Sequence, residues 1–286
     1  MSATREIKRR IKSARNIGQV TKALQMVSAV KMRRAQMAAS QGRPYADFLA
    51  EAILSLTGEA EVKHPFLVMP TKEAKVLMVV IGPSKGLAGP LISGLNKKVW
   101  EFVNQKNCEV VGVSFGKKGR ESILRSNVTL EADFGSVKNQ VLADQISALT
   151  TYIDDGFRAG KYDLVYVIYN RFVNTMEQEP TVWQLLPAVT WKGQAEQVNV
   201  QFTFEPSRSM ILDRLLDHYL KTTLRQIIFD SIASEHSARM VAMKNANENA
   251  TEIISELSLK YNKTRQAMVT SEIADIISGV LGSQQV

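Results

Sequence analysis

The sequence predicts an α/β protein with a long antiparallel α-helical coiled coil, and three observations carry this prediction. Residues 207–278 contain no Gly or Pro, residues 1–40 combine a regular apolar rhythm with an excess of basic side chains, and the segment between them alternates short apolar runs with amphipathic stretches. We therefore expect three parts: an N-terminal helix over 1–60, an α/β globular domain over 70–195 and a C-terminal helix over 207–286.

The C-terminal stretch is too long for an ordinary globular helix. If fully helical, residues 207–278 extend ~108 Å at 1.5 Å per residue, so the helix needs a partner helix or an enclosing protein. Apolar or small residues recur at intervals of three and four, and this spacing predicts one buried seam: Leu216, Leu220, Leu224, Ile228, Ile232, Met240, Met243, Ala246, Ala250, Ile253, Leu257, Tyr261, Thr264 and Met268. The alternative is a long helix packed along a large domain.

The N-terminal stretch holds the whole positive excess of the chain. Residues 1–40 contain ten Lys or Arg and one acid, Glu6, for a net charge of +9, whereas residues 41–206 sum to −1 and residues 207–286 to zero, which recovers the total of +8. Apolar residues recur here at intervals of three and four, and this spacing predicts a helix: Ile7, Ile11, Ala14, Ile17, Val20, Leu24, Val27 and Val30. Gly18 is the weak point of this helix. A transit peptide, a contact with nucleic acid or anionic membrane, and a helix that binds acidic proteins all agree with such a segment.

The middle of the chain predicts a mostly parallel sheet covered by helices, a Rossmann-like α/β domain. The expected strands cover residues 76–81, 108–115, 164–169 and 181–186, and the expected helices cover residues 87–105, 118–126 and 138–159.

No motif predicts catalysis, a metal site or a cofactor. The turn from Gly82 to Gly89 follows a strand but matches neither dinucleotide nor P-loop patterns. The three histidines, His64, His218 and His236, lack metal-ligand spacing. The single cysteine, Cys108, is expected to be a buried core thiol. No apolar run reaches the roughly 18 residues that a membrane span needs.

Both ends of the chain resemble the gamma subunit of F-type ATP synthase. The N-terminal motifs are Arg5-Glu-Ile-Lys-Arg-Arg-Ile-Lys12, Gln19-Val-Thr-Lys-Ala-Leu24 and Lys31-Met-Arg-Arg-Ala-Gln36. The C-terminal motifs are Ser234-Glu-His-Ser-Ala-Arg-Met-Val-Ala-Met-Lys-Asn-Ala246 and Tyr261-Asn-Lys-Thr-Arg-Gln266. The chain departs from the family at Leu24, where Met is common, and at Gly86-Leu-Ala-Gly-Pro90, and it lacks the paired cysteines of chloroplast forms.

The resemblance implies a non-catalytic rotor subunit. In this family the two terminal helices form an asymmetric shaft inside a ring of alpha and beta subunits, and its rotation couples transmembrane proton flow to ATP synthesis or hydrolysis on the beta subunits. The implied partners are the alpha and beta subunits, the epsilon subunit and the c-ring, with no cofactor and no nucleic acid. The implied location is the cytoplasmic face of the plasma membrane, as a peripheral protein.

The resemblance also implies which residues meet the beta subunits. Arg265 and Gln266 match the contacts to the catch loop of one beta subunit, and Lys22 and Leu24 match the coupling face near the beta levers. Thr270 and Glu272 match a segment that stabilises coupling.

A different class of function is a basic coiled-coil protein that binds nucleic acid and carries an α/β regulatory domain. It predicts an affinity that falls steeply with salt. Residues 1–40 contain no Phe, Tyr or Trp for base stacking.

Overall fold

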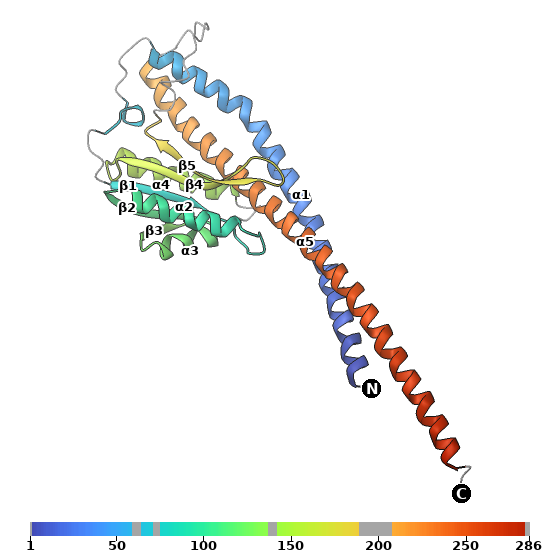
Figure 1. The fold of residues 1–286 in the computed structure, drawn as a ribbon. Helices are drawn as coiled ribbons and strands as arrows, with labels where there is room; N and C mark the ends of the chain where they lie inside the picture. The colour runs from blue at the N-terminus through green and yellow to red at the C-terminus, as the bar shows by residue number, and fades with distance from the viewer. Residues whose placement is uncertain (1, 59–63, 71–74, 137–141, 189–207, 284–286) are drawn as a thin grey trace. The chain divides into compact units, whose positions relative to one another are not determined.

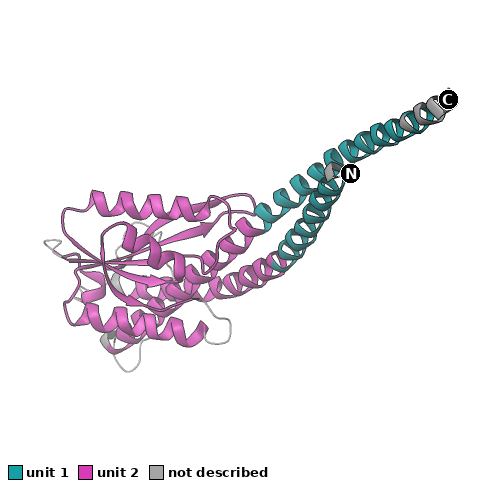
Figure 2. Ribbon diagram, turned by 90° about the horizontal axis from the view of Figure 1, so that it is seen from below, with its two compact units in different colours: residues 1–27, 240–286 teal, residues 28–239 magenta. Residues whose placement is uncertain are grey.

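The computed structural model describes residues 2–58, 64–70, 75–136, 142–188 and 208–283. Its residues divide into two compact units: unit 1 comprises residues 1–27 and 240–286, and unit 2 comprises residues 28–239 (Figure 2). The long helices α1 (Ser2–Gly58) and α5 (Arg208–Ser283) contribute to both units. The expected helix start at 138 and the expected boundaries at 60, 195, 207 and 286 lie outside the described residues.

The core of unit 2 is a five-stranded sheet with the order β3-β2-β1-β4-β5. The strands β1 (Lys75–Ile81), β2 (Glu109–Phe115), β3 (Thr129–Asp133) and β4 (Leu164–Phe172) pair in parallel, while β5 (Gln178–Leu186) pairs antiparallel with β4. The fold class is confirmed. The sequence prediction missed β3, whose residues are only partly buried and form one edge of the sheet.

Helices cover both faces of the sheet (Figure 1). The helices α2 (Leu91–Gln105) and α3 (Lys117–Arg125) pack on one face, where Met78 and Val80 of β1 meet Val99 and Ile123. On the other face, α4 (Leu142–Arg158) and the first half of α5 enclose the alternate residues of β1. Because both faces are buried, the central strands are continuous apolar runs.

The first half of α5 belongs to the core of the α/β domain. Leu216, Leu220, Leu224 and Ile228 are fully buried in one cluster with sheet residues such as Val79 and Val167. For this half of the helix the structure therefore agrees with the alternative, a long helix packed along a domain. Ile232 at its end is only partly buried.

Within unit 2, α1 also runs antiparallel to α5. A Cβ atom built at Gly42 would lie 3.4 Å from Gln226 Oε1, whereas Lys31, earlier in α1, acts electrostatically on His236, later in α5. Ile53 and Leu56 near the end of α1 are fully buried in the same cluster as the sheet. Cys108 is only half-buried and precedes β2, so its predicted place inside a strand was wrong.

Candidate functional site

The two helices of unit 1 meet along a seam of small residues. A Cβ atom built at Gly18 would lie 3.6 Å from Asn247 Oδ1 and 3.7 Å from Ala250 Cβ, so α1 and α5 approach closely there. Thr21 is buried in α1, and its hydroxyl donates to the carbonyls of Ile17 and Gly18 at 3.0 Å. The helix therefore buries a hydroxyl at the seam without needing a partner across it.

The structure corrects the predicted seam of α1. Ile17, Val20 and Val27 are 54%, 59% and 53% exposed, and Val30 in unit 2 is 52% exposed. These four residues lie beside the line Ile7, Ile11, Ala14, Gly18 and Thr21 and not on it. We call Ile17, Val20 and Val27 the apolar stripe of α1; it leaves large β-branched side chains in contact with solvent in unit 1.

In the C-terminal half of α5 the predicted seam holds with one exception. Met243 and Ala250 are buried, whereas Ile253 is 48% exposed and Ile254 is partly buried in its place. Other large apolar side chains of this half are also exposed, among them Leu259, Val269, Ile273, Ile276 and Ile277. A contiguous exposed apolar surface is typical of sites where another protein binds.

The predicted site residues fall on two surfaces of unit 1. Lys22 is exposed and Leu24 half-buried on α1, while Arg265, Gln266, Thr270 and Glu272 are exposed on α5. The Thr270 hydroxyl donates to the Gln266 carbonyl at 2.9 Å, so these two lie on adjacent turns. Gly18 lies against Asn247, which is 18 residues or ~27 Å along α5 from Arg265. The α1 pair and the α5 group are therefore separate.

The positive charge of α1 is solvent-accessible. All ten Lys and Arg residues of the first 40 are exposed, and Arg10 pairs with the one acid, Glu6, at 2.6 Å. Like charges crowded on one helix repel one another and favour an acidic partner.

Sequence reasoning missed a buried ion pair in unit 2 that joins α5 to the β1–α2 loop. Arg239 donates to Glu235 at 2.7 Å and to the carbonyl of Lys85 at 3.1 Å, and both ionic side chains are about nine-tenths buried. Glu235 in turn accepts from the Ser84 amide at 3.2 Å. A Glu and an Arg four residues apart on an otherwise buried helix face were the available signal. The β1–α2 loop thus connects a strand to a helix, as predicted, and its backbone also binds α5 through Glu235 and Arg239.

Two titratable groups of unit 2 have perturbed pKa values. Burial raises the pKa of Asp230 to about 6, against the opposing effect of Arg43 and Arg171. Burial, with Arg239, Lys31 and Lys85, lowers the pKa of His236 to about 4, so this imidazole is neutral at pH 7. Both groups belong to unit 2, whereas the predicted partner-binding residues belong to unit 1.

Each of the three histidines has different neighbours in the fold. His64 caps the short 3₁₀ helix Pro65–Leu67 and bonds Asp213 at 2.7 Å, His218 is exposed and His236 contacts Arg239. Among the described residues, no three His, Cys, Asp or Glu side chains cluster as metal ligands would. Of the described helices, none is both long enough and apolar enough to cross a bilayer.

Comparisons with known proteins agree with this architecture. Residues 3–281 match the family model described as ATP synthase. The chain is 41% identical over 284 residues to the ATP synthase gamma chain of Roseiflexus sp. (strain RS-1), with 98% of each chain covered. It is 38% identical over 285 residues to the ATP synthase gamma chain of Chloroflexus aurantiacus, again with 98% of each covered.

Solved structures share the fold. A chain of the Euglena gracilis mitochondrial ATP synthase (OSCP/F1/c-ring, rotational state 3) is 17% identical with a TM-score of 0.66, and 98% of this chain and 94% of that chain are covered. The central stalk/c-ring structure of the Tetrahymena thermophila enzyme gives 24% identity and a TM-score of 0.59, covering 79% and 99%. These matches leave the nucleic-acid-binding alternative without support, and the full-length matches decide the assignment: the chain belongs to the ATP synthase gamma-chain family.

Proposed function

We propose that this chain is the rotating central stalk of an F-type ATP synthase. Its long helices would turn inside a ring of alpha and beta subunits and couple proton flow to ATP synthesis or hydrolysis, while the ATP chemistry stays on the beta subunits. Family membership over the whole chain carries this proposal. The exposed apolar and cationic side chains of α1 and α5 support it, because a shaft gripped by other proteins needs contact groups outside its seam.

The mechanism follows from a mismatch of symmetry. A single asymmetric shaft presents different side chains to chemically identical beta subunits at any one angle. It therefore stabilises a different conformation, and a different nucleotide affinity, in each of them. Turning the shaft redistributes these conformations, so the chain acts as a mechanical effector.

Within this function we assign roles to two surfaces. Arg265 and Gln266 would hold the catch loop of a beta subunit, with Thr270 and Glu272 on the following turns, while Lys22 and Leu24 would meet the beta levers. Five of these six residues are exposed in unit 1 and Leu24 is half-buried, which leaves the exposed ones accessible to partners. The charge of α1 supports an acidic lever as its neighbour.

Different segments of the chain would meet different partners. The helical segments 1–60 and 207–286 would supply the shaft, and the α/β segment 70–195 would meet the epsilon subunit and the c-ring. The complex would lie at the cytoplasmic face of the plasma membrane, with this chain held there by its partners.

Affinity purification tests the assignment as a rotor. The tagged full-length chain should bring down three alpha and three beta subunits, with epsilon and the c-ring, from detergent extracts. A chain that assembles with none of them would contradict the proposal.

The catch-loop contact has its own test in the assembled complex. The double variant Arg265→Ala/Gln266→Ala should lower the rates of ATP synthesis and of ATP-driven rotation by roughly tenfold, since charge-assisted hydrogen bonds contribute ~1.5–3 kcal/mol. The control is Lys260→Ala, an exposed cation on the same helix without an assigned role. Equal rates for the double variant and the control would refute the role of these two residues and leave the rotor assignment intact.

A further inference from the structure

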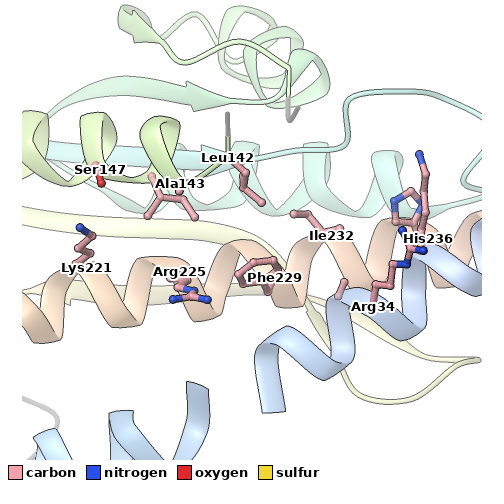
Figure 3. A pocket seen from close by; sticks show the side chains of 12 residues that line it. Arg34, Leu142, Ala143, Ser147, Lys221, Arg225, Phe229, Ile232 and His236 are labelled. Carbon is pink, nitrogen blue, oxygen red and sulfur yellow. The ribbon is translucent and has the colours of Figure 1, made fainter. Parts of the chain in front are cut away.

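An open groove of about 580 Å³ lies within unit 2 between α4 and α5, with α1 at one end (Figure 3). Its middle is apolar: Leu142 of α4 lies across from Phe229 and Ile232 of α5 (Figure 3), and Ile146 of α4 also lines the groove. Leu142 and Ile146 are 8% and 4% exposed, so the wall that they form is fixed by the core beneath it. The volume lies in the range of ~300–1,000 Å³ that is typical of small-molecule sites.

Cations flank this apolar middle on both sides. Lys31 and Arg34 of α1 stand at one end, and Lys221 and Arg225 of α5 at the other. Along α5, Lys221 and His236 are 15 residues or ~22 Å apart, and Figure 3 shows Arg34 beside His236. All four cations are exposed, and none forms an ion pair with another residue that the structure describes.

The lining of the groove is one-sided in charge. Among the described residues that line it there is no Asp or Glu, and Lys31 contributes to the positive field at its α1 end. That field is visible in His236, whose pKa is lowered by burial and then by Arg239, Lys31 and Lys85. Arg239 is already paired with Glu235 at 2.7 Å, so Lys31 and Arg34 are the lining cations beside His236 that are open to an anion. His236 stays neutral at pH 7 and offers a ring face in place of a charge.

We propose that this groove binds a long-chain amphipathic anion. The alkyl chain would lie on Leu142, Ile146, Phe229 and Ile232, and a carboxylate or phosphate head would lie between Lys31 and Arg34. The apolar middle lacks the hydrogen-bond donors and acceptors that a nucleotide base needs. An unbranched alkyl chain needs only an apolar surface as long as the groove. An anionic head between two cations gains charge-assisted hydrogen bonds that a neutral amphiphile lacks.

Such a ligand has two sources, a free fatty acid or an anionic membrane lipid. Titration calorimetry of the full-length chain with hexadecanoate, below the concentration at which it forms micelles, probes the first. Flotation with vesicles of phosphatidylglycerol, compared with vesicles of phosphatidylcholine, probes the second. Acetate, which has the carboxylate head without the alkyl chain, tests the head alone. Dodecyl maltoside, which has an alkyl chain and a neutral head, tests the chain alone. Neither should bind in the groove.

Matched variants locate the head group. Lys31→Gln/Arg34→Gln should weaken hexadecanoate binding by roughly tenfold, because the head loses both charged donors. Lys8→Gln/Arg9→Gln removes one Lys and one Arg from the same helix outside the groove and should leave the affinity within about twofold, the usual scale of distant surface charges. If both pairs weaken binding equally, the effect is net charge alone and the proposal is wrong.

A third variant tests the tail. Ala143 is an exposed groove residue on α4, so Ala143→Phe should fill the space without disturbing the core and should abolish binding of hexadecanoate. Circular dichroism checks that the variant keeps its fold. Unchanged affinity would refute the groove as the site. Failure of hexadecanoate and of phosphatidylglycerol vesicles to bind the wild-type chain, with capture of an acidic helical peptide instead, would also overturn the proposal.

Discussion

Asp230 and His236 lie six residues apart on α5, and the fold changes their proton affinities in opposite directions. Burial raises the pKa of Asp230 to about 6 from an ordinary value of 3.8, and burial lowers the pKa of His236 to about 4 from an ordinary value of 6.5. Between pH 4 and 6 the folded chain holds a proton on Asp230 that the unfolded chain releases. Over nearly the same range the unfolded chain holds a proton on His236 that the folded chain lacks.

The two groups therefore act on stability with opposite signs. As pH rises through the Asp230 window, the fold must accept a half-buried carboxylate and the free energy of unfolding falls. As pH rises through the His236 window, the unfolded chain loses its proton advantage and the free energy of unfolding increases. The contributions partly cancel in the wild-type chain.

Asp230→Asn should remove one side of this balance. At pH 7.5 the variant should be more stable than wild type by about 1 kcal/mol, a figure reduced for partial solvent access and for the lost attraction to Arg43 and Arg171. Near pH 4, where Asp230 is protonated, the two proteins should be equally stable. Urea unfolding of the full-length chain at both pH values measures the difference.

Asp47→Asn, an exposed acid on α1, is the matched control and should shift neither midpoint appreciably. A stabilisation by Asp230→Asn that is equal at pH 4 and pH 7.5 would show that desolvation of the carboxylate is not its cause.

The apolar stripe shows which residue-level features the sequence alone left undetermined. The apolar spacing, which puts intervals of three and seven between Ile17, Val20 and Val27, predicted a helix correctly, but it did not separate these exposed residues from the residues of the seam. Periodicity reports only that apolar residues share a face, and an exposed face reserved for a partner has the same period as a buried one. The seam instead uses Gly18 and Thr21, which a hydrophobic pattern ignores.

At the scale of elements, the close approach of the β1–α2 loop to α3 depends on paired glycines. A Cβ atom built at Gly119 would lie 2.6 Å from the Val80 carbonyl oxygen, and one built at Gly82 would lie 2.2 Å from the Gly119 amide nitrogen. Both neighbours are backbone atoms, so neither side chain rotation nor local repacking relieves the overlap. This contact holds the β1–α2 loop in place, and carbonyl oxygens of that loop accept hydrogen bonds from Arg239.

Gly119→Ala should therefore destabilise the chain by ~1–3 kcal/mol, the usual cost of overpacking a core. Gly86→Ala in the neighbouring loop is the control, since no atom lies within 4 Å of the added Cβ. It should change stability by less than ~0.5 kcal/mol, as open surface positions do. Urea midpoints for both variants measure the contrast, and equal midpoints would mean that α3 shifts to admit a methyl group.

The elements of the α/β domain were largely predictable because their signals are local. The central strands are continuous apolar runs that end at Gly or polar residues, and α2, α3 and α4 follow them with one buried face each. The edge strand β3 was missed because only one neighbour, β2, pairs with it, and its residues alternate polar and apolar. The role of the Glu235–Arg239 pair could not be predicted, because its partners lie in a loop more than 150 residues away in the chain.

At the scale of the whole molecule, function depends on surfaces that pattern reasoning finds only in part. The excess charge of α1 was evident from composition, and all ten of its cations are exposed. The packing of the first half of α5 on the sheet was not evident, since its Leu and Ile spacing fits a coiled coil and a domain core equally well. Which side of a helix meets a partner is decided by that partner, whose sequence is not part of this chain.

The exposed cations lead to a prediction about assembly with alpha and beta subunits. If α1 faces acidic levers, Lys8→Gln/Lys12→Gln should lower the association rate of this chain with an alpha–beta ring by roughly threefold at low salt, because long-range attraction steers encounter. The difference should vanish near 0.5 M salt, where the Debye length falls to ~4–5 Å. Lys97→Gln/Lys117→Gln, two exposed lysines of the α/β domain, should have a smaller effect. Stopped-flow measurement of assembly over a salt series distinguishes the two pairs. Equal rates at every salt concentration would mean that the charge of α1 does not guide assembly, and its excess over the rest of the chain would then need another acidic partner.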